Sequence, residues 1–246
     1  METKYSKLSY EQYFIDTSGD YNKTGKARFE IIYNDIEYQY KDRICHANYE
    51  IHYEPSRNVI QINFQETDGI KDWFVNLMFT QKYYNAFDYN GKPIVLKVHN
   101  GWASMYKAMK DDVRTKFIDL YKMYPTAEIE IVGWSLGSGQ AMLCAQDLYF
   151  NYGIKSHLYT YGSVNPFKTN IFNRRKIKRY LRECCKEVYN FADRSDIVSY
   201  LPFRFIFGFI KIQRVNIKGR FKLFGLFNPY KYHTHYDQKD LYSKIR

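Results

Sequence analysis

The sequence predicts an α/β fold in which a largely parallel central sheet is flanked by helices, with a β-hairpin near the N-terminus. Three observations indicate this: an early pair of β-rich runs, later β-rich runs that alternate with segments of helical periodicity, and abundant apolar residues. Of the 246 residues, 45% are hydrophobic and 19% aromatic, which suffices for one large core. Because no linker or repeat interrupts the chain, we expect a single domain over residues 1–246.

The hairpin is predicted from residues 49–54 and 59–64. Both runs are rich in β-branched and aromatic residues, and Pro55-Ser56-Arg57-Asn58 between them is typical of a turn.

Strands and helices then alternate along the chain. Val113, Phe117 and Leu120 recur at helical spacing, and Pro125 ends that helix. The other predicted segments are strands over residues 93–98, 128–132, 158–161 and 188–192, and helices over residues 136–149 and 173–185. This order predicts parallel strands covered by helices on both faces of the sheet.

The chain is strongly basic, with a formal net charge of +11 and a pI of about 9.2. Such a charge favours acidic partners, which include nucleic acid, an anionic membrane surface and a negatively charged substrate. The densest cationic run, residues 174–182, is compatible with contact to lipid headgroups or phosphates. A run of this kind is more often a solvated helix face.

The cysteines indicate a reducing compartment. Cys45, Cys144, Cys184 and Cys185 show neither a metal-ligand spacing nor a disulfide framework. The first seven residues lack the apolar segment of a signal peptide, and no run of about 18 apolar residues occurs. We therefore expect an intracellular protein, cytoplasmic or peripheral to membranes, without a transmembrane segment.

Gly133-Trp134-Ser135-Leu136-Gly137 is a G-x-S-x-G sequence between a predicted strand and a predicted helix. This is the pattern of the nucleophile elbow in the α/β-hydrolase fold, where the serine sits at a strained apex. A serine hydroxyl needs a histidine base and a carboxylate that orients it, which follow in the order Ser, Asp or Glu, His. Asp193 and Asp196 precede His233 and His235, so both carboxylates and both histidines are candidates.

Several segments together resemble the class 3 lipases, which include fungal triacylglycerol lipases and feruloyl esterases. They occur in the order found in that family and cover roughly residues 59–236. The segments are Asn63-Phe64-Gln65-Glu66-Thr67-Asp68 with Asp72-Trp73, Val98-His99-Asn100-Gly101-Trp102, the elbow through Ala141, Tyr161-Gly162-Ser163-Val164-Asn165, Asp196-Ile197-Val198 with Leu201-Pro202, and His233-Thr234-His235-Tyr236.

The resemblance implies a carboxylic ester hydrolase that acts on a lipid or similar ester through an acyl-enzyme. Lipase, esterase and phospholipase activities all fall within this expectation. It implies Ser135 as nucleophile, Asp196 as acid and His233 as base. His233 is chosen over His235 because the family's histidine stands three residues before an aromatic residue, here Tyr236. Asp193 remains the second candidate for the acid. No cofactor and no metal are implied, and the oligomeric state is left open.

The resemblance also implies an oxyanion hole and a lid. The backbone N–H of Leu136 and Thr67 are the expected oxyanion donors. Residues that follow Thr67 form an apolar stripe at helical spacing, which is either a lid that contacts the acyl chain or a helix packed permanently on the core. The stripe includes Ile70, Trp73, Phe74 and Leu77. His99, although part of a family-like segment, is interpreted as structural.

Three departures from the family pattern support a second hypothesis. Gln65 and Glu66 replace the usual Arg and Gly, and Trp134 replaces the usual His inside the elbow. A carboxylate at position 66 would oppose negative charge that develops in the oxyanion site. The alternative is therefore a catalytically silent lipase-like binding protein. A nucleic-acid-binding protein would explain the charge but none of the ordered segments, so no nucleic acid partner is expected.

Overall fold

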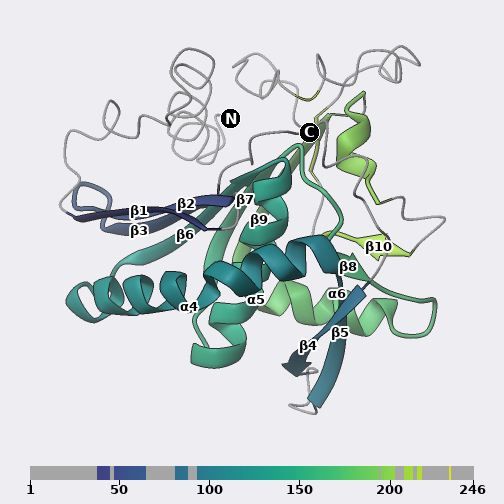
Figure 1. Cartoon of the computed structure of the whole chain (residues 1–246), viewed down its shortest axis with the longest axis horizontal. Helices are drawn as coiled ribbons and strands as arrows, with labels where there is room; N and C mark the ends of the chain where they lie inside the picture. The colour runs from purple at the N-terminus through teal and green to yellow at the C-terminus, as the bar shows by residue number, and fades with distance from the viewer. Residues whose placement is uncertain are drawn as a thin grey trace.

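The computed structural model describes residues 38–44, 47–64, 81–87, 93–193, 195–202, 208–212, 215–217 and 233. Within these ranges a seven-stranded sheet and a four-stranded sheet form the framework (Figure 1). The elements are β1 (Tyr38–Ile44), β2 (Ala47–Glu54), β3 (Val59–Phe64), β4 (Gln81–Phe87), β5 (Pro93–His99), α4 (Asn100–Met123), β6 (Glu128–Trp134), α5 (Leu136–Tyr152), β7 (Ser156–Tyr161), β8 (Phe167–Lys168), α6 (Arg174–Glu183), β9 (Cys185–Asp193), the 3₁₀ turn η1 (Ile197–Tyr200), β10 (Phe209–Ile210) and β11 (Val215–Ile217).

The larger sheet has the strand order β1-β2-β3-β6-β7-β9-β11. The strands from β3 to β11 in this order are parallel, while β1 and β2 are antiparallel to their neighbours. All six residues of β3 are buried, as is typical of a parallel strand that is covered on both faces. The largely parallel central sheet that the sequence predicts is therefore confirmed.

The predicted hairpin is confirmed as β2 and β3. Tyr49 pairs with Phe64 at one end, and Glu54 pairs with Val59 next to the turn. The Asn58 N–H donates to the Pro55 carbonyl at 3.1 Å, and Asn58 has a φ of 52°. Asparagine tolerates this left-handed conformation better than most residues.

The predicted strand over residues 93–98 exists, but it does not belong to the parallel sheet. It forms β5 in the smaller sheet, whose order β10-β8-β5-β4 is antiparallel throughout. The burial pattern gives the reason, since Val95 and Lys97 are exposed while Leu96 and Val98 are fully buried. This alternation suits an antiparallel strand with one exposed face, and it differs from the continuous burial along β3.

Helices α4, α5 and α6 form one layer on the sheet. Tyr106 of α4 donates a hydrogen bond to Asp147 of α5 at 2.9 Å, and Gln146 of α5 donates to Tyr180 of α6 at 3.1 Å. Gly139 of α5 also lets α4 approach closely, because a Cβ there would lie 2.4 Å from the Trp102 ring of α4. The described helices therefore cover one face of the sheet, whereas the sequence predicts cover on both.

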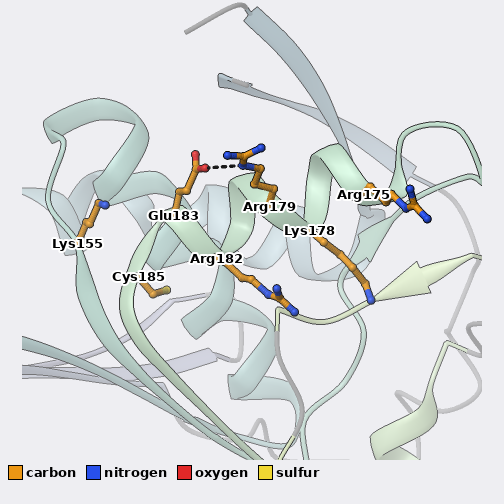
Figure 2. Close-up of a pocket in the computed structure, with 7 residues that line it drawn as sticks. All are labelled: Lys155, Arg175, Lys178, Arg179, Arg182, Glu183 and Cys185. Carbon is orange, nitrogen blue, oxygen red and sulfur yellow. Dashed lines mark ion pairs between the residues drawn. The ribbon is translucent and has the colours of Figure 1, made fainter. Parts of the chain in front are cut away.

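The helix α6 is amphipathic. Ile177, Tyr180 and Leu181 face the core at i, i+3 and i+4, and the cationic side chains lie on the outer face around a shallow hollow (Figure 2). In the part of the chain that the structure describes, no helix is both long enough and apolar enough to cross a membrane.

His99 is buried at the start of α4 and acts as its N-cap. Its Nδ1 accepts a hydrogen bond from the Gly101 N–H at 3.2 Å, which requires a neutral ring. The ring lies 4.3 Å from the Trp102 ring and 5.8 Å from the Phe209 ring, measured between centroids. Burial lowers the pKa of His99 from 6.5 to about 4.

We expect His99 to make the protein less stable in mild acid. Between about pH 6.5 and 4 the unfolded chain binds a proton at His99 and the folded chain does not, so stability falls as the pH falls through this interval. The lowered pKa corresponds to about 3 kcal/mol of unfolding free energy. His99→Asn keeps an acceptor at the cap but cannot titrate, so urea unfolding should show a shallower pH dependence for the variant. Equal slopes for variant and wild type would contradict this assignment.

Candidate active site

The turn from β6 into α5 places Ser135 at a sharp corner of the backbone. Ser135 has a φ of 52° and a ψ of −120°, a conformation that costs energy for any residue except glycine. The surrounding contacts hold it there. A Cβ on Gly133 would lie 2.5 Å from the Gly137 carbonyl oxygen, so strand and helix approach too closely for any other residue. The Ser135 N–H donates to the Tyr161 carbonyl at the end of β7 at 2.9 Å.

Asp196 lies just beyond β9 and caps the 3₁₀ turn η1. Its Oδ1 accepts a hydrogen bond from the Val198 N–H at 2.9 Å, and its carbonyl accepts one from the Ser199 hydroxyl at 2.9 Å. These contacts fix the carboxylate and leave Oδ2 directed at His233. The Asp193 side chain forms a local hydrogen bond instead, in which its Oδ1 accepts from the Ser195 N–H at 2.6 Å.

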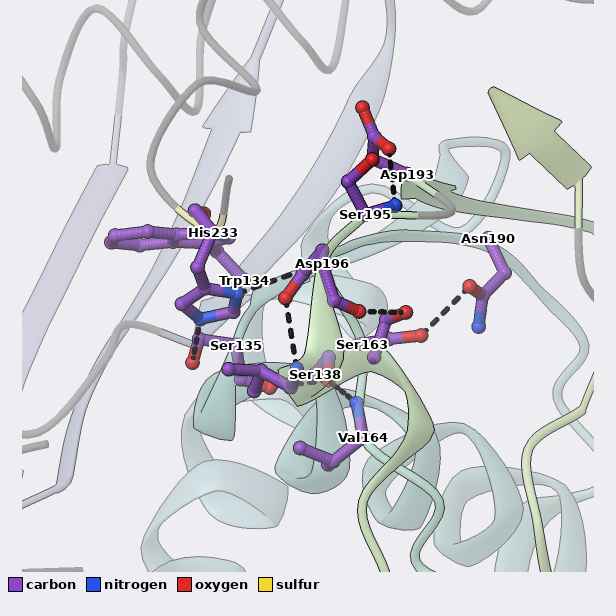
Figure 3. A network of polar contacts seen from close by, with 12 residues as sticks. Trp134, Ser135, Ser138, Ser163, Val164, Asn190, Asp193, Ser195, Asp196 and His233 are labelled. Atoms are coloured by element: carbon purple, nitrogen blue, oxygen red, sulfur yellow. Dashed lines mark hydrogen bonds and ion pairs between the residues drawn. The ribbon is translucent and has the colours of Figure 1, made fainter. Parts of the chain in front are cut away.

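The structure brings Ser135, His233 and Asp196 together from three distant parts of the chain (Figure 3). His233 Nε2 lies 2.6 Å from Ser135 Oγ, and His233 Nδ1 lies 3.0 Å from Asp196 Oδ2. The exposed fractions of Ser135, His233 and Asp196 are 1%, 1% and 0%. A buried carboxylate, imidazole and hydroxyl in this order can activate the hydroxyl as a nucleophile, because electrostatic interactions are strong where water is excluded.

Trp134 contacts the same histidine. Its ring stacks on the His233 ring with centroids 5.6 Å apart and an interplanar angle of 22°. Its indole N–H donates to the His233 carbonyl oxygen at 3.3 Å. The residue that departs from the family pattern inside the elbow therefore fixes both the backbone and the ring of His233.

A buried lysine holds the segment that carries Asp196. Lys211 is 8% exposed, and its Nζ donates to the Ser199 carbonyl at 2.6 Å, to the Ser163 hydroxyl at 3.2 Å and to the Ser163 carbonyl. Asn165 supports the same segment, because its Nδ2 donates to the carbonyls of Tyr200 and Pro202 at 2.9 and 3.2 Å.

The sequence argument did not identify Lys211, Asn165 or Ser163 as supports of the site. One signal was present for Lys211, since it is a single charge in the apolar run Phe209-Ile210-Lys211-Ile212. A charge in such a run indicates a buried cation that needs several acceptors. Ser163 and Asn165 both lie in the family-like segment Tyr161-Gly162-Ser163-Val164-Asn165, which marks the segment but not their role as supports.

The other predicted site residues divide into two groups. Leu136 is the first residue of α5, so its N–H has no acceptor within the helix and lies next to the nucleophile. Thr67, the stripe residues Ile70, Trp73, Phe74 and Leu77, and the second histidine His235 lie outside the described residues. Over the described ranges, no group of three His, Cys, Asp or Glu side chains could hold a metal ion.

Comparisons with known proteins agree with this geometry. A family model described as lipase (class 3) matches residues 61–206, which is more than half of the chain. A lipase from Rhizomucor miehei is 32% identical over 94 residues, 38% of this chain and 24% of that protein. The matched region thus spans about a quarter of that lipase.

Two solved structures share the fold. The triacylglyceride lipase of Rhizomucor miehei has a TM-score of 0.62 at 23% identity, with 75% of this chain and 67% of that chain covered. Lipase II from Rhizopus niveus has a TM-score of 0.62 at 21% identity, with 84% of this chain and 75% of that chain covered. The predicted α/β-hydrolase fold is confirmed by this likeness, and by its family model and ordered motifs the chain belongs to the class 3 lipase family.

Proposed function

We propose that this chain hydrolyses carboxylic esters of lipids through an acyl-enzyme on Ser135. One observation carries the proposal: Ser135 Oγ lies 2.6 Å from His233 Nε2, and the opposite ring nitrogen lies 3.0 Å from Asp196. Membership of the class 3 lipases supports the type of reaction. The alternative, a silent binding protein with this fold, predicts no covalent chemistry at Ser135.

In the first half of the proposed reaction, Ser135 Oγ attacks the carbonyl carbon of the ester while His233 Nε2 takes the hydroxyl proton. Asp196 accepts a hydrogen bond from Nδ1 and stabilises the imidazolium that forms. When the tetrahedral intermediate collapses, the alkoxy group leaves with the proton from His233, and the acyl group stays on Ser135.

In the second half, His233 takes a proton from water, and the resulting hydroxide attacks the acyl carbon. The carboxylic acid leaves when His233 returns the proton to Ser135 Oγ. Each step uses the same hydrogen-bonded pair, so a single arrangement of His233 and Asp196 serves both halves.

Negative charge develops on the carbonyl oxygen in both tetrahedral intermediates. The N–H of Leu136 is placed to donate to that oxygen, because it follows Ser135 at the first position of α5. The N-terminal end of this 17-residue helix adds a favourable dipole. Thr67 is proposed as the second donor by its place in the family pattern.

The family supports a lipid ester as the proposed substrate. The relative from Rhizomucor miehei is a triacylglyceride lipase, which favours a glycerolipid as the ester here. Ser135 is 1% exposed, so an ester reaches its hydroxyl only when the site opens. Assays with nitrophenyl esters of increasing chain length, followed by triacylglycerol and phospholipid, would distinguish a lipase from a phospholipase and from a short-chain esterase.

The direct test is covalent labelling. The protein should react with a fluorophosphonate probe, and Ser135→Ala should abolish both the labelling and ester turnover, by about 10³-fold or more in kcat. Ser104→Ala is the control for removal of a serine hydroxyl elsewhere, because Ser104 is exposed on α4. Folded protein that fails to react would favour the silent binding protein.

The acid and the base are tested separately. We expect His233→Ala and Asp196→Asn each to lower kcat by about 10³-fold or more while the thermal unfolding temperature shows a folded protein. Asp193→Asn should retain far more activity, since its carboxylate accepts from the Ser195 N–H. Near-normal turnover in Asp196→Asn would transfer the role of acid to Asp193, and near-normal turnover in His233→Ala would transfer that of base to His235.

Trp134 is proposed as a positioning residue for His233. Trp134→Phe keeps an aromatic ring but loses the N–H that donates to the His233 carbonyl, so kcat should fall about 2- to 10-fold with little change in KM. The rate of labelling by the fluorophosphonate should fall by a similar factor, because it depends on the activation of Ser135. Trp102→Phe, a buried indole of α4, is the control for a general loss of packing. If both variants lower kcat equally, Trp134 has no specific role.

A further inference from the structure

Two apolar side chains project into solvent from the turn before α6. Ile171 is 84% exposed and Phe172 is 89% exposed, more than any other large hydrophobic side chain that the structure describes. The turn is ordered by its own hydrogen bonds. Asn170 Oδ1 accepts from the N–H groups of Phe172 and Asn173 at 3.0 and 2.9 Å, and Asn173 Oδ1 accepts from the Asn170 N–H at 2.9 Å. The exposure therefore belongs to a turn with a defined shape.

The helix that follows presents a cationic hollow (Figure 2). The hollow has a volume of about 630 Å³ and contains five cationic side chains and one carboxylate. Its lining residues are Lys155, Arg175, Lys178, Arg179, Arg182, Glu183 and Cys185. Arg175, the first of the helix cations in the hollow, stands three residues after Phe172, so the apolar turn and the cations are adjacent.

Most of this positive charge is not neutralised within the protein. Glu183 pairs with Arg179 at 3.4 Å, whereas Arg175, Lys178 and Arg182 have no carboxylate partner in the described part of the chain. The pKa of Lys178 is lowered, first by burial and then by the neighbouring cations Arg174 and Arg182. Crowded cations of this kind gain most from an anion that enters between them.

We propose that Ile171, Phe172 and the cationic outer face of α6 form a docking surface for an anionic lipid bilayer. The two apolar side chains enter the headgroup region, and the cations around the hollow contact lipid phosphates. An apolar element beside a cluster of Lys and Arg is the combination that binds proteins to an anionic interface.

The apolar pair favours lipid over nucleic acid as the source of the phosphates. A nucleic acid would satisfy the cations, and an aromatic ring such as Phe172 can stack on a base. Ile171 cannot stack on a base, so a nucleic acid would leave this side chain, which is 84% exposed, in contact with water. A bilayer removes both side chains from water, so one partner accounts for the turn and for the charge.

The docking surface is separate from the catalytic residues. Neither the turn nor α6 supplies Ser135, Asp196 or His233, and no residue of the hollow contacts them in the described structure. The proposal therefore concerns binding and can hold whether or not the chain hydrolyses esters. It can be tested with lipids that no esterase cleaves.

The experiment measures cosedimentation of the full chain with vesicles of ether-linked lipids, either phosphatidylcholine alone or phosphatidylcholine with phosphatidylserine. Binding should require phosphatidylserine and weaken with salt. Arg175→Gln/Arg182→Gln should weaken binding about 20-fold or more, from about fivefold for each cation. The control Lys107→Gln/Lys122→Gln removes two exposed cations from α4 and should bind as the wild type does.

The apolar arm uses Ile171→Ser/Phe172→Ser, which should weaken binding about tenfold or more. Met123→Ser/Tyr152→Ser is its control, since these side chains are 46% and 44% exposed on other helices. Equal binding to both vesicle types, or equal loss in test and control variants, would overturn the proposal. It would also be overturned if a DNA duplex binds, the vesicles do not, and the serine pair leaves DNA binding unchanged. Thermal unfolding of every variant confirms that each is folded.

Discussion

The close approach of β6 to α5 is the constraint on which the site depends. Gly133 and Gly137 meet where any side chain on Gly133 would collide with the backbone, so glycine at position 133 permits the reversal in which Ser135 adopts a positive φ. The same reversal sets Leu136, whose N–H is the proposed oxyanion donor, directly after Ser135 at the start of α5. The Ser135 N–H is tied to Tyr161 of β7, so the strained corner is held by the parallel sheet itself. The backbone geometry of Ser135 is thus fixed by the strands β6 and β7 and the helix α5.

Asp196 and His233, the proposed acid and base, do not lie in a turn of this kind. Side chains from distant parts of the chain, Lys211 and Trp134, hold them in place. Lys211 donates to the carbonyl of Ser163, in the segment after β7, and to the carbonyl of Ser199, in the 3₁₀ turn that follows β9. Lys211 donates to the uncharged acceptors of Ser163 and Ser199 and thereby fixes this loop, in which the Oδ2 of Asp196 lies 3.0 Å from His233 Nδ1. Trp134 of β6 stacks on the His233 ring. The imidazole is therefore contacted both by β6 and by Asp196 of the loop that follows β9.

Local patterns sufficed for most of the fold. The hairpin, the C-terminal end of α4 and the strand before the elbow follow from periodicity, turn residues and a proline that stops a helix. The sheet to which β5 belongs could not be predicted in this way, because strand pairing is decided by distant partners such as β4 and β8. The site follows the same division: the elbow is contiguous in sequence, whereas the contacts of Trp134 with His233 and of Lys211 with Ser163 join residues far apart in the chain.

Cations of two kinds occur in the described part of the molecule: those paired with carboxylates in the framework, and those of the α6 surface that is proposed to contact lipid. Cations within the framework are matched by carboxylates: Arg57 binds Glu54 at 2.7 Å and Glu130 at 3.2 Å, and Arg114 binds Asp147 at 2.7 Å. Paired charges contribute little to the field outside the protein. The net charge of +11 is therefore felt most where cations lack partners, and among the described elements α6 concentrates them. This concentration of cations supports the proposed docking of α6 on an anionic bilayer, an attraction that salt would weaken.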